Sequence, residues 1–400
     1  MPSAFARNAI VLGLLTAIGP FAIDMYLPAL PAISAHLEAS TAATQATLMA
    51  FFVAFGICQI AYGPVSDMVG RKPPLYVGLC LFFVASIGCV FSPTIGWLIA
   101  FRFIQGVGAS AIMVVPRAII RDLHTGLEAA RLMSLVMLVF SVSPILAPLI
   151  GSALIVPFGW RAVFVAISIA SGLGLLLVAF ALPETLPPQQ RIKISLKSVL
   201  ASYSILLLDR HFLALTFIGA FGMASFFAFL ASSSFIYINH FGMTPTQYSL
   251  AFAINAIGFI GASQFSATLS RRFGVARVVS IAVACYTAMA VLLFVITAAG
   301  LTDLAVLMTL IFLAFTWLGL VIPLTMVLAL EEHGRIAGMA SALGGTLQML
   351  TGAAIIVAVS LFFNGTALPM VTTIALCALA AFTLSRFTLR AGTMVAKPAE

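Results

Sequence analysis

Residues 161–182 read RAVFVAISIASGLGLLLVAFAL, and the residues that follow them, 183–197, read PETLPPQQRIKISLK. The first stretch carries one charged residue, Arg161, at its start. A helix of about 20 mostly apolar residues is long enough to cross the hydrocarbon core of a bilayer. The first stretch therefore predicts a membrane-spanning helix, and the second predicts a polar connection outside the membrane.

Apolar stretches of similar length occur on both sides of this connection. Before 161–182 they cover 8–28, 44–66, 74–92, 97–120 and 131–155, and after the connection they cover 212–238, 247–269, 276–299, 302–329, 336–362 and 367–388. The sequence thus predicts an all-α integral membrane protein with twelve transmembrane helices in two six-helix bundles. We expect the bundles at 1–182 and 212–390, a cytoplasmic linker at 183–211 and a cytoplasmic tail at 391–400.

The composition supports the same class of protein. The chain is 62% hydrophobic and 8% charged, which is too little charge to cover the surface of a soluble domain. The net charge of +8 does not indicate nucleic acid binding, because the basic residues lie in short loops between apolar stretches. The five cysteines lie in apolar segments, and no histidines pair at metal-ligand spacing, so we expect neither a disulfide nor a metal.

The basic residues also predict the orientation. Sixteen of the nineteen lysines and arginines fall on one side of the predicted spans or at its membrane edge. Because cytoplasmic loops carry an excess of such residues, we expect both termini and the linker to be cytoplasmic. An even number of spans also requires the two termini to share a side.

Charged residues at membrane depth are costly and indicate function by default. Asp24 is the one acid inside the predicted spans, and Arg102 lies about five residues into the fourth. By residue count both lie at similar depth, so the two are expected to interact directly or through water. Asp24 is the candidate proton carrier and also a candidate contact for a cationic substrate. The alternatives are a helix-end carboxylate without a transport role and a purely structural pair.

Other polar and aromatic residues are candidates for substrate contact. They are Tyr26, Gln105, Phe226, Asn255 and Gln348. For each aromatic residue, ordinary packing is the simpler interpretation, because the chain contains thirty-three phenylalanines.

Two segments are candidates for a conformational gate. The loop after the second span contains Gly63, Asp67, Gly70 and Arg71, in which the acid is expected to cap a helix or pair with an arginine. The fifth span contains the helix-bending residues Pro144 and Pro148, followed by Gly151. A static turn and ordinary helix packing are the alternatives. A similar loop, with serine, glycine and basic residues at the same spacing, follows the eighth span at 270–277, as expected for a repeat.

These motifs resemble those of a known family. The loop from Gly63 to Lys72 resembles the signature loop of the major facilitator superfamily, with Met68 in place of its usual arginine. Residues 102–110, RFIQGVGAS, resemble the span-four motif associated with proton coupling, and residues 147–152, APLIGS, resemble the span-five antiporter motif with two of its glycines replaced. Residues 24–31, DMYLPALP, resemble the span-one signature of drug:proton antiporters of the Bcr/CflA type.

The resemblance implies a function. It implies alternating access through a central cavity and efflux of compounds such as phenicols or bicyclomycin, driven by inward proton flow across a bacterial inner membrane. It implies that Asp24 is the protonation site and that Arg102 assists coupling. We expect protons as the coupling ion, no cofactor and a monomer in the lipid.

Other functions remain as alternatives. A transporter of a metabolite such as an amino acid, nucleoside or siderophore would use the same fold. An integral-membrane enzyme is disfavoured because the acids are scattered and no histidine pair is present. A channel is disfavoured because no polar filter segment is visible. The chain contains no phosphate-binding loop, which argues against ATP-driven transport.

Overall fold

The computed structural model describes residues 4–191 and 196–392, and all regular elements in these ranges are helical. The chain divides into two compact units. The first contains the described residues up to Leu196 and the stretch Met243–Ala253, and the second contains Lys197–Gly242 and the described residues from Ile254 onward.

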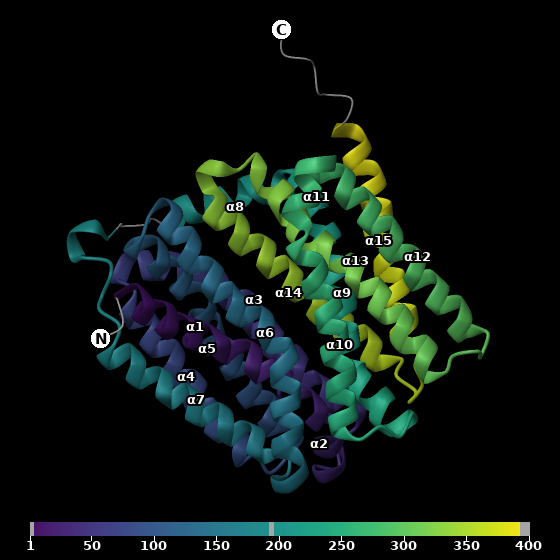
Figure 1. Ribbon diagram of the computed structural model, residues 1–400. Helices are drawn as coiled ribbons and strands as arrows, with labels where there is room; N and C mark the ends of the chain where they lie inside the picture. Colours follow the sequence, from purple (N-terminus) through teal and green to yellow (C-terminus); the bar gives the residue numbers. More distant parts are fainter. Residues whose placement is uncertain (1–3, 192–195, 393–400) are drawn as a thin grey trace. The chain divides into compact units, whose positions relative to one another are not determined.

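The first unit holds the following elements, labelled as in Figure 1: α1 (Ala4–Asp24), η1 (Leu27–Ala29), α2 (Leu30–His36), α3 (Thr41–Val69), α4 (Lys72–Val90), α5 (Ile95–Leu123), α6 (Gly126–Phe158), α7 (Arg161–Phe180) and η2 (Pro188–Gln190). The second unit holds α8 (Leu196–Leu208), α9 (Arg210–Ser234), η3 (Phe235–His240), α11 (Ser266–Phe273), α12 (Val275–Ala298), α13 (Leu304–Glu331), η4 (Gly334–Ile336), α14 (Ala337–Leu361) and α15 (Leu368–Gly392). Helix α10 (Pro245–Gln264) contributes residues to both units.

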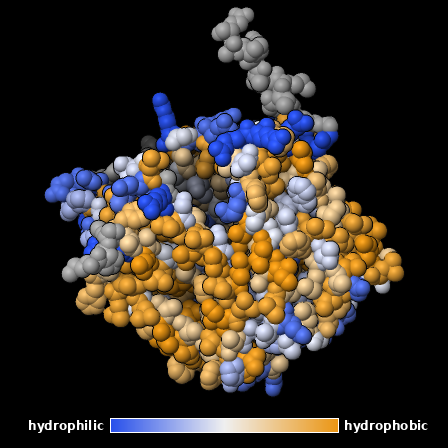
Figure 2. Space-filling view, viewed as in Figure 1, coloured by the Kyte–Doolittle hydropathy of each residue, from blue (hydrophilic) through white to orange (hydrophobic). Residues whose placement is uncertain are grey.

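Membrane spans account for most of these helices. In the described part of the chain, eleven helical segments are long and apolar enough to cross a bilayer, and there are twelve when α10 and α11, bent by 40°, are counted as one span. Large apolar side chains such as Leu176, Phe180 and Phe387 are exposed, as expected for a surface that lipid covers. Figure 2 shows apolar side chains over much of the surface in view. The predicted all-helical membrane fold is confirmed.

The two units share one scheme of helix packing. In the first unit α1 packs on α6, and α4 packs on both α5 and α7. In the second unit the corresponding helices pair in the same way: α9 packs on α14, and α12 packs on both α13 and α15. Each unit also has an equivalent close contact at a glycine. A Cβ atom at Gly106 would lie 2.3 Å from the carbonyl oxygen of Phe51, and a Cβ atom at Gly319 would lie 2.1 Å from the carbonyl oxygen of Phe259. Each unit therefore uses a glycine to bring its fourth span against its second.

The observed boundaries differ from the expected ones in three places. The first span runs from Phe5 to His36 and is interrupted after Asp24, whereas a single helix over 8–28 was expected. The expected linker contains helix α8, because its second half is rich in leucine and other helix-forming residues. The last helix continues to Gly392, and the rest of the expected tail lies outside the described residues.

Candidate functional site

The first span is broken where its sequence carries two prolines. Helix α1 ends at Asp24, a short 3₁₀ turn includes Pro28, and Pro31 opens α2. A proline has no backbone N–H and cannot continue the hydrogen-bond ladder of a preceding helix. The last carbonyl groups of α1 therefore need other donors.

Arg102 of α5 supplies one of these donors. Its Nη1 donates to the carbonyl oxygen of Ala22 at 3.2 Å and to Oε1 of Gln105 at 3.0 Å. The guanidinium carbon lies 4.7 Å from the centre of the Tyr26 ring and 4.6 Å from that of the Phe51 ring. Both rings present their electron-rich faces to the cation, which stabilises a charge that is completely buried. Arg102 thus holds the break of the first span against α5.

A second set of hydrogen bonds fixes the same region. The hydroxyl of Tyr26 lies 2.6 Å from Oγ1 of Thr47 on α3, which donates to the carbonyl oxygen of Thr44 at 2.5 Å. Nε2 of Gln105 donates to Oγ of Ser86 on α4 at 2.7 Å. These contacts join the first four spans into one buried polar network.

Asp24 lies at the C-terminal end of α1, and only 6% of its surface is exposed. The ion pairs among the described residues are those of Arg71 with two aspartates and those of two histidines with a carboxylate, so none includes Asp24. The expected interaction of Asp24 with Arg102 is therefore not a direct ion pair. Arg102 instead binds the carbonyl group of Ala22, two residues before Asp24. This arrangement leaves the carboxyl group of Asp24 without a fixed cationic partner among the described residues.

The fifth span packs directly on the break. A Cβ atom at Gly151 of α6 would lie 2.2 Å from the carbonyl oxygen of Met25, so only glycine allows this approach. Helix α6 also contains Pro144 and Pro148. The carbonyl oxygen of Pro148 accepts a hydrogen bond of 2.8 Å from Oγ of Ser249, which belongs to the same compact unit. The span-five motif thus lies beside the residue that follows Asp24.

The loop between α3 and α4 centres on Arg71, which is almost completely buried. Its guanidinium donates to Oδ1 of Asp67 at 2.5 Å, to Oγ of Ser66 at 2.9 Å and to Oδ2 of Asp122 at 2.7 Å. Burial disfavours the cation, but the hydrogen bonds and negative charges of Asp122 and Asp67 outweigh this effect and raise the pKa of Arg71. The loop is therefore tied to the end of α5, and its role as a gate stays a prediction.

Glu184, which the sequence analysis did not single out, completes this cluster. Its carboxylate accepts hydrogen bonds from the backbone N–H groups of Arg71 at 2.9 Å and Lys72 at 3.1 Å, so it caps the start of α4. Burial raises the pKa of Glu184, but hydrogen bonds from backbone N–H groups have the larger combined effect and bring it below its usual value. Gly70 has φ +101°, and a Cβ atom there would lie 2.8 Å from Oε2 of Glu184. At Gly63 a Cβ atom would meet nothing within 4 Å, so packing does not explain that glycine.

Asp209 caps a helix in the second unit in a related way. Its Oδ1 accepts hydrogen bonds from the backbone N–H groups of His211 at 2.8 Å and Phe212 at 3.2 Å, and its Oδ2 lies 2.9 Å from Nε2 of His333. Burial raises the pKa of Asp209, but these hydrogen bonds and the charge of His333 lower it below its usual value. The contact joins the start of α9 to the end of α13.

The structure distributes the candidate substrate-binding residues over both units. Tyr26 and Gln105 are completely buried in the network around Arg102. In the second unit, the ring of Phe226 packs against two other phenylalanine rings, and Asn255 and Gln348 are buried. Substrate contact by these residues stays a prediction, and for Tyr26 and Gln105 it would require their exposure in another conformation.

The sequence and the fold are similar to those of known transporters. The family model described as Major Facilitator Superfamily matches residues 12–356. Among curated proteins, an uncharacterized MFS-type transporter of Bacillus subtilis, YdgK, is 39% identical over 350 residues, which are 86% of either chain. A bicyclomycin resistance protein homolog of Haemophilus influenzae is 30% identical over 92% of either chain. A chloramphenicol resistance protein of Pseudomonas aeruginosa is 29% identical over 92% of this chain and 87% of its own. Among solved structures, a POT family transporter has a TM-score of 0.77 at 12% identity, covering 98% of this chain and 97% of that one.

Proposed function

This chain belongs to the major facilitator superfamily of membrane transporters, and from that premise we propose that it exports small amphipathic drugs across a bacterial inner membrane in exchange for protons. The observation that carries the proposal is the placement of Asp24. It is a buried carboxyl group at the break of a membrane span, and no ion pair among the described residues includes it. A carboxyl group without a fixed counter-ion is free to alternate between a proton and a substrate.

Substrate and proton exclude one another at this carboxyl group in the proposed cycle. Deprotonated Asp24 favours binding of substrate from the cytoplasm, the loaded protein opens outwards, and the substrate leaves. A proton from outside then binds Asp24, and the protonated protein returns. One acid of this kind indicates one proton for each cycle, so export of a neutral drug carries net charge.

Arg102 connects the state of Asp24 to the packing of the spans. Its hydrogen bond to the carbonyl group of Ala22 and its contact with the Tyr26 ring hold both sides of the break. Because arginine keeps its charge, the gain or loss of a proton at Asp24, two residues after Ala22, is the change in charge that we propose alters this contact. Arg102 is therefore proposed as a positioning residue for coupling.

The relatives support the class of substrate. Two of them are named for resistance to bicyclomycin and chloramphenicol, and this chain covers most of their length. We propose compounds of this kind as substrates, with both termini of the protein on the cytoplasmic side, no cofactor and a monomer as the working form.

Drug accumulation in cells tests this function. We expect cells that express the protein to accumulate less chloramphenicol than cells with an empty vector, and a protonophore to abolish the difference. Asp24→Asn, at equal expression, should accumulate as much as the empty vector, whereas Asp303→Asn, at an acidic helix cap outside the spans, should behave as the wild type. A panel of phenicols, bicyclomycin and lipophilic cations without any difference from the empty vector would contradict drug export and favour transport of a metabolite.

A further inference from the structure

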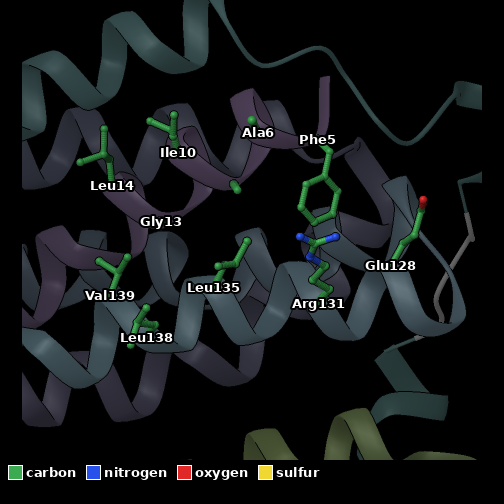
Figure 3. A pocket seen from close by; sticks show the side chains of 11 residues that line it. Phe5, Ala6, Ile10, Gly13, Leu14, Glu128, Arg131, Leu135, Leu138 and Val139 are labelled. Carbon is green, nitrogen blue, oxygen red and sulfur yellow. The ribbon is translucent and has the colours of Figure 1, made fainter. Parts of the chain in front are cut away.

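A crevice of about 840 Å³ lies between the first halves of α1 and α6 (Figure 3). It is lined from α1 by Phe5, Ala6, Ala9, Ile10, Gly13 and Leu14, and from α6 by residues between Glu128 and Val139. At its inner end the helices meet, since a Cβ atom at Gly13 would lie 3.3 Å from Cγ2 of Val139. The crevice therefore lies between the starts of the two helices and narrows at Gly13, where α1 approaches α6.

Two charged residues line the crevice near the start of α6, and one of them contacts a histidine. Nδ1 of His124 lies 2.9 Å from Oε2 of Glu128, so the glutamate is paired. The guanidinium carbon of Arg131 lies 5.5 Å from the centre of the Phe5 ring, and no ion pair among the described residues includes Arg131. The crevice thus offers a cation with unused donors, and apart from Arg131 and Glu128 its lining side chains are apolar.

The crevice shares a helix face with Asp24. Along α1, Ile10, Leu14, Ala17, Phe21 and Asp24 follow one another at steps of four and three residues, which places them on one face. The first four of these side chains are exposed or half-buried, in contrast to the buried residues Val11, Leu12, Leu15 and Ile18 on the opposite face. At 1.5 Å for each residue, the distance along the helix from Ile10 to Asp24 is about 21 Å.

We propose that this crevice is the entry site of the transported substrate, an amphipathic molecule that places acceptor oxygen atoms at Arg131 and its apolar body between α1 and α6. The proposal rests on the drug export proposed above and names the class of drug that the protein takes first. From the crevice the substrate moves along the exposed face of α1 to Asp24.

The size of the crevice and the charge of Arg131 both favour a small amphipathic molecule. Pockets for small molecules usually measure about 300–1,000 Å³ and combine apolar walls with a few polar groups, as this one does. A neutral compound with nitro, carbonyl or hydroxyl oxygens satisfies the guanidinium donors of Arg131. A lipophilic cation has no proton acceptor to meet at Arg131, which repels it. Chloramphenicol is the matching probe, and tetraphenylphosphonium is the matched cationic control.

Protection of an introduced thiol measures occupancy directly. In purified Ala9→Cys protein in lipid nanodiscs, we expect chloramphenicol to slow the reaction of the new thiol with N-ethylmaleimide several-fold, as measured on its own peptide by mass spectrometry. The exposed native Cys80 should react at an unchanged rate and serves as the internal control. Arg131→Gln in the same background should abolish the protection, and tetraphenylphosphonium should give none.

Transport kinetics provide a second measurement. Arg131→Gln should raise KM for chloramphenicol on the order of ten-fold, which equals about 1.4 kcal/mol of binding free energy, at unchanged kcat. Arg277→Gln, which removes an exposed arginine of the second unit, should leave KM unchanged. Ala9→Phe, which fills the crevice, should raise KM, whereas Ala170→Phe on the exposed face of α7 should not.

The outcomes separate this inference from the function on which it rests. Wild-type vesicles without any pH-driven chloramphenicol uptake would overturn drug export, and the entry site with it. If wild-type vesicles take up chloramphenicol but chloramphenicol does not protect the thiol of Ala9→Cys, the entry site alone is overturned. Protection by phosphatidylglycerol in the nanodisc and not by chloramphenicol would also overturn it, because the crevice would then hold a lipid.

Discussion

Replacing Gly151 by alanine tests whether the break of the first span depends on close contact with α6. The added Cβ atom would lie 2.2 Å from the carbonyl oxygen of Met25, about 1.2 Å short of the 3.4 Å at which ordinary contacts begin. The atom in the way belongs to the backbone, so the two helices have to separate. Overpacking of this kind costs about 1–3 kcal/mol, and the higher helix propensity of alanine returns at most about 1 kcal/mol. We expect a net loss of about 1–2 kcal/mol in stability.

The matched control is Gly172→Ala in α7, where the added atom would lie 3.4 Å from Cε2 of Phe83, an ordinary contact. Thermal unfolding of the purified proteins, followed by tryptophan fluorescence in one detergent, should show a midpoint several degrees lower for Gly151→Ala and an unchanged or higher midpoint for the control. Chloramphenicol export should fall for Gly151→Ala only. Equal midpoints for Gly151→Ala and the wild type would refute the account of the break as a contact that only glycine permits.

Three further predictions concern helix caps and the internal repeat. Glu184→Gln should lower stability by about 0.5–1 kcal/mol at neutral pH in denaturation assays. Folding lowers the pKa of Glu184 below its usual 4.5, so the stability difference between Glu184→Gln and the wild type should be complete above pH 4.5 and vanish as the pH falls through the lowered pKa. A stability difference that persists in acid would contradict the ionised carboxylate as its cause. Asp209→Ala should destabilise more than Asp303→Ala in thermal unfolding, because both remove a helix cap but only the first also removes a hydrogen-bonded contact with His333. Equal losses would assign that contact no stability. Gly106→Ala and Gly319→Ala should lower the melting temperature by similar amounts, since the added atoms would lie 2.3 Å and 2.1 Å from a carbonyl oxygen, and a loss confined to one of them would argue against equivalent contacts in the two units.

The sequence predicts the spans well because their signal is local. A run of about 20 apolar residues can be recognised without knowing its neighbours. The break in the first span is less local. Pro28 and Pro31 indicate that a helix ends, but they do not show that the span resumes as α2 and continues to His36.

The pairing of Asp67 with an arginine was one of two expectations for that acid, but the partners of Arg102 and Glu184 were not predictable from the sequence. Residue counts place Asp24 and Arg102 at similar depth, and opposite charges at similar depth suggest a pair. In the structure Arg102 binds the carbonyl group of Ala22, which is available because α1 ends nearby. Glu184 caps a helix whose start lies more than a hundred residues earlier in the chain, and no local pattern connects the two. The proline and threonine beside Glu184 mark the end of a span but not its contact.

Helix α8 shows a different limit of sequence reasoning. The stretch after residue 183 is polar and basic, and this composition predicts a linker between the two halves but no particular helix within it. Residues 196–208 within it carry seven leucine, isoleucine or valine residues and form a helix too short to cross a membrane. The average composition of the whole stretch does not show that its second half is more apolar than its first.

The account depends most on Asp24 as the group that exchanges a proton for the drug. Proteoliposomes with wild-type or Asp24→Asn protein can be compared in two modes: accumulation of labelled chloramphenicol driven by a pH gradient, and exchange of labelled for unlabelled drug without a gradient. Because an asparagine cannot bind or release a proton, the account predicts that Asp24→Asn loses gradient-driven accumulation. Because its neutral side chain resembles the protonated carboxyl group, which excludes substrate, the account predicts that drug exchange falls as well. Accumulation by Asp24→Asn at the wild-type rate would contradict the account and place the proton site elsewhere in the chain.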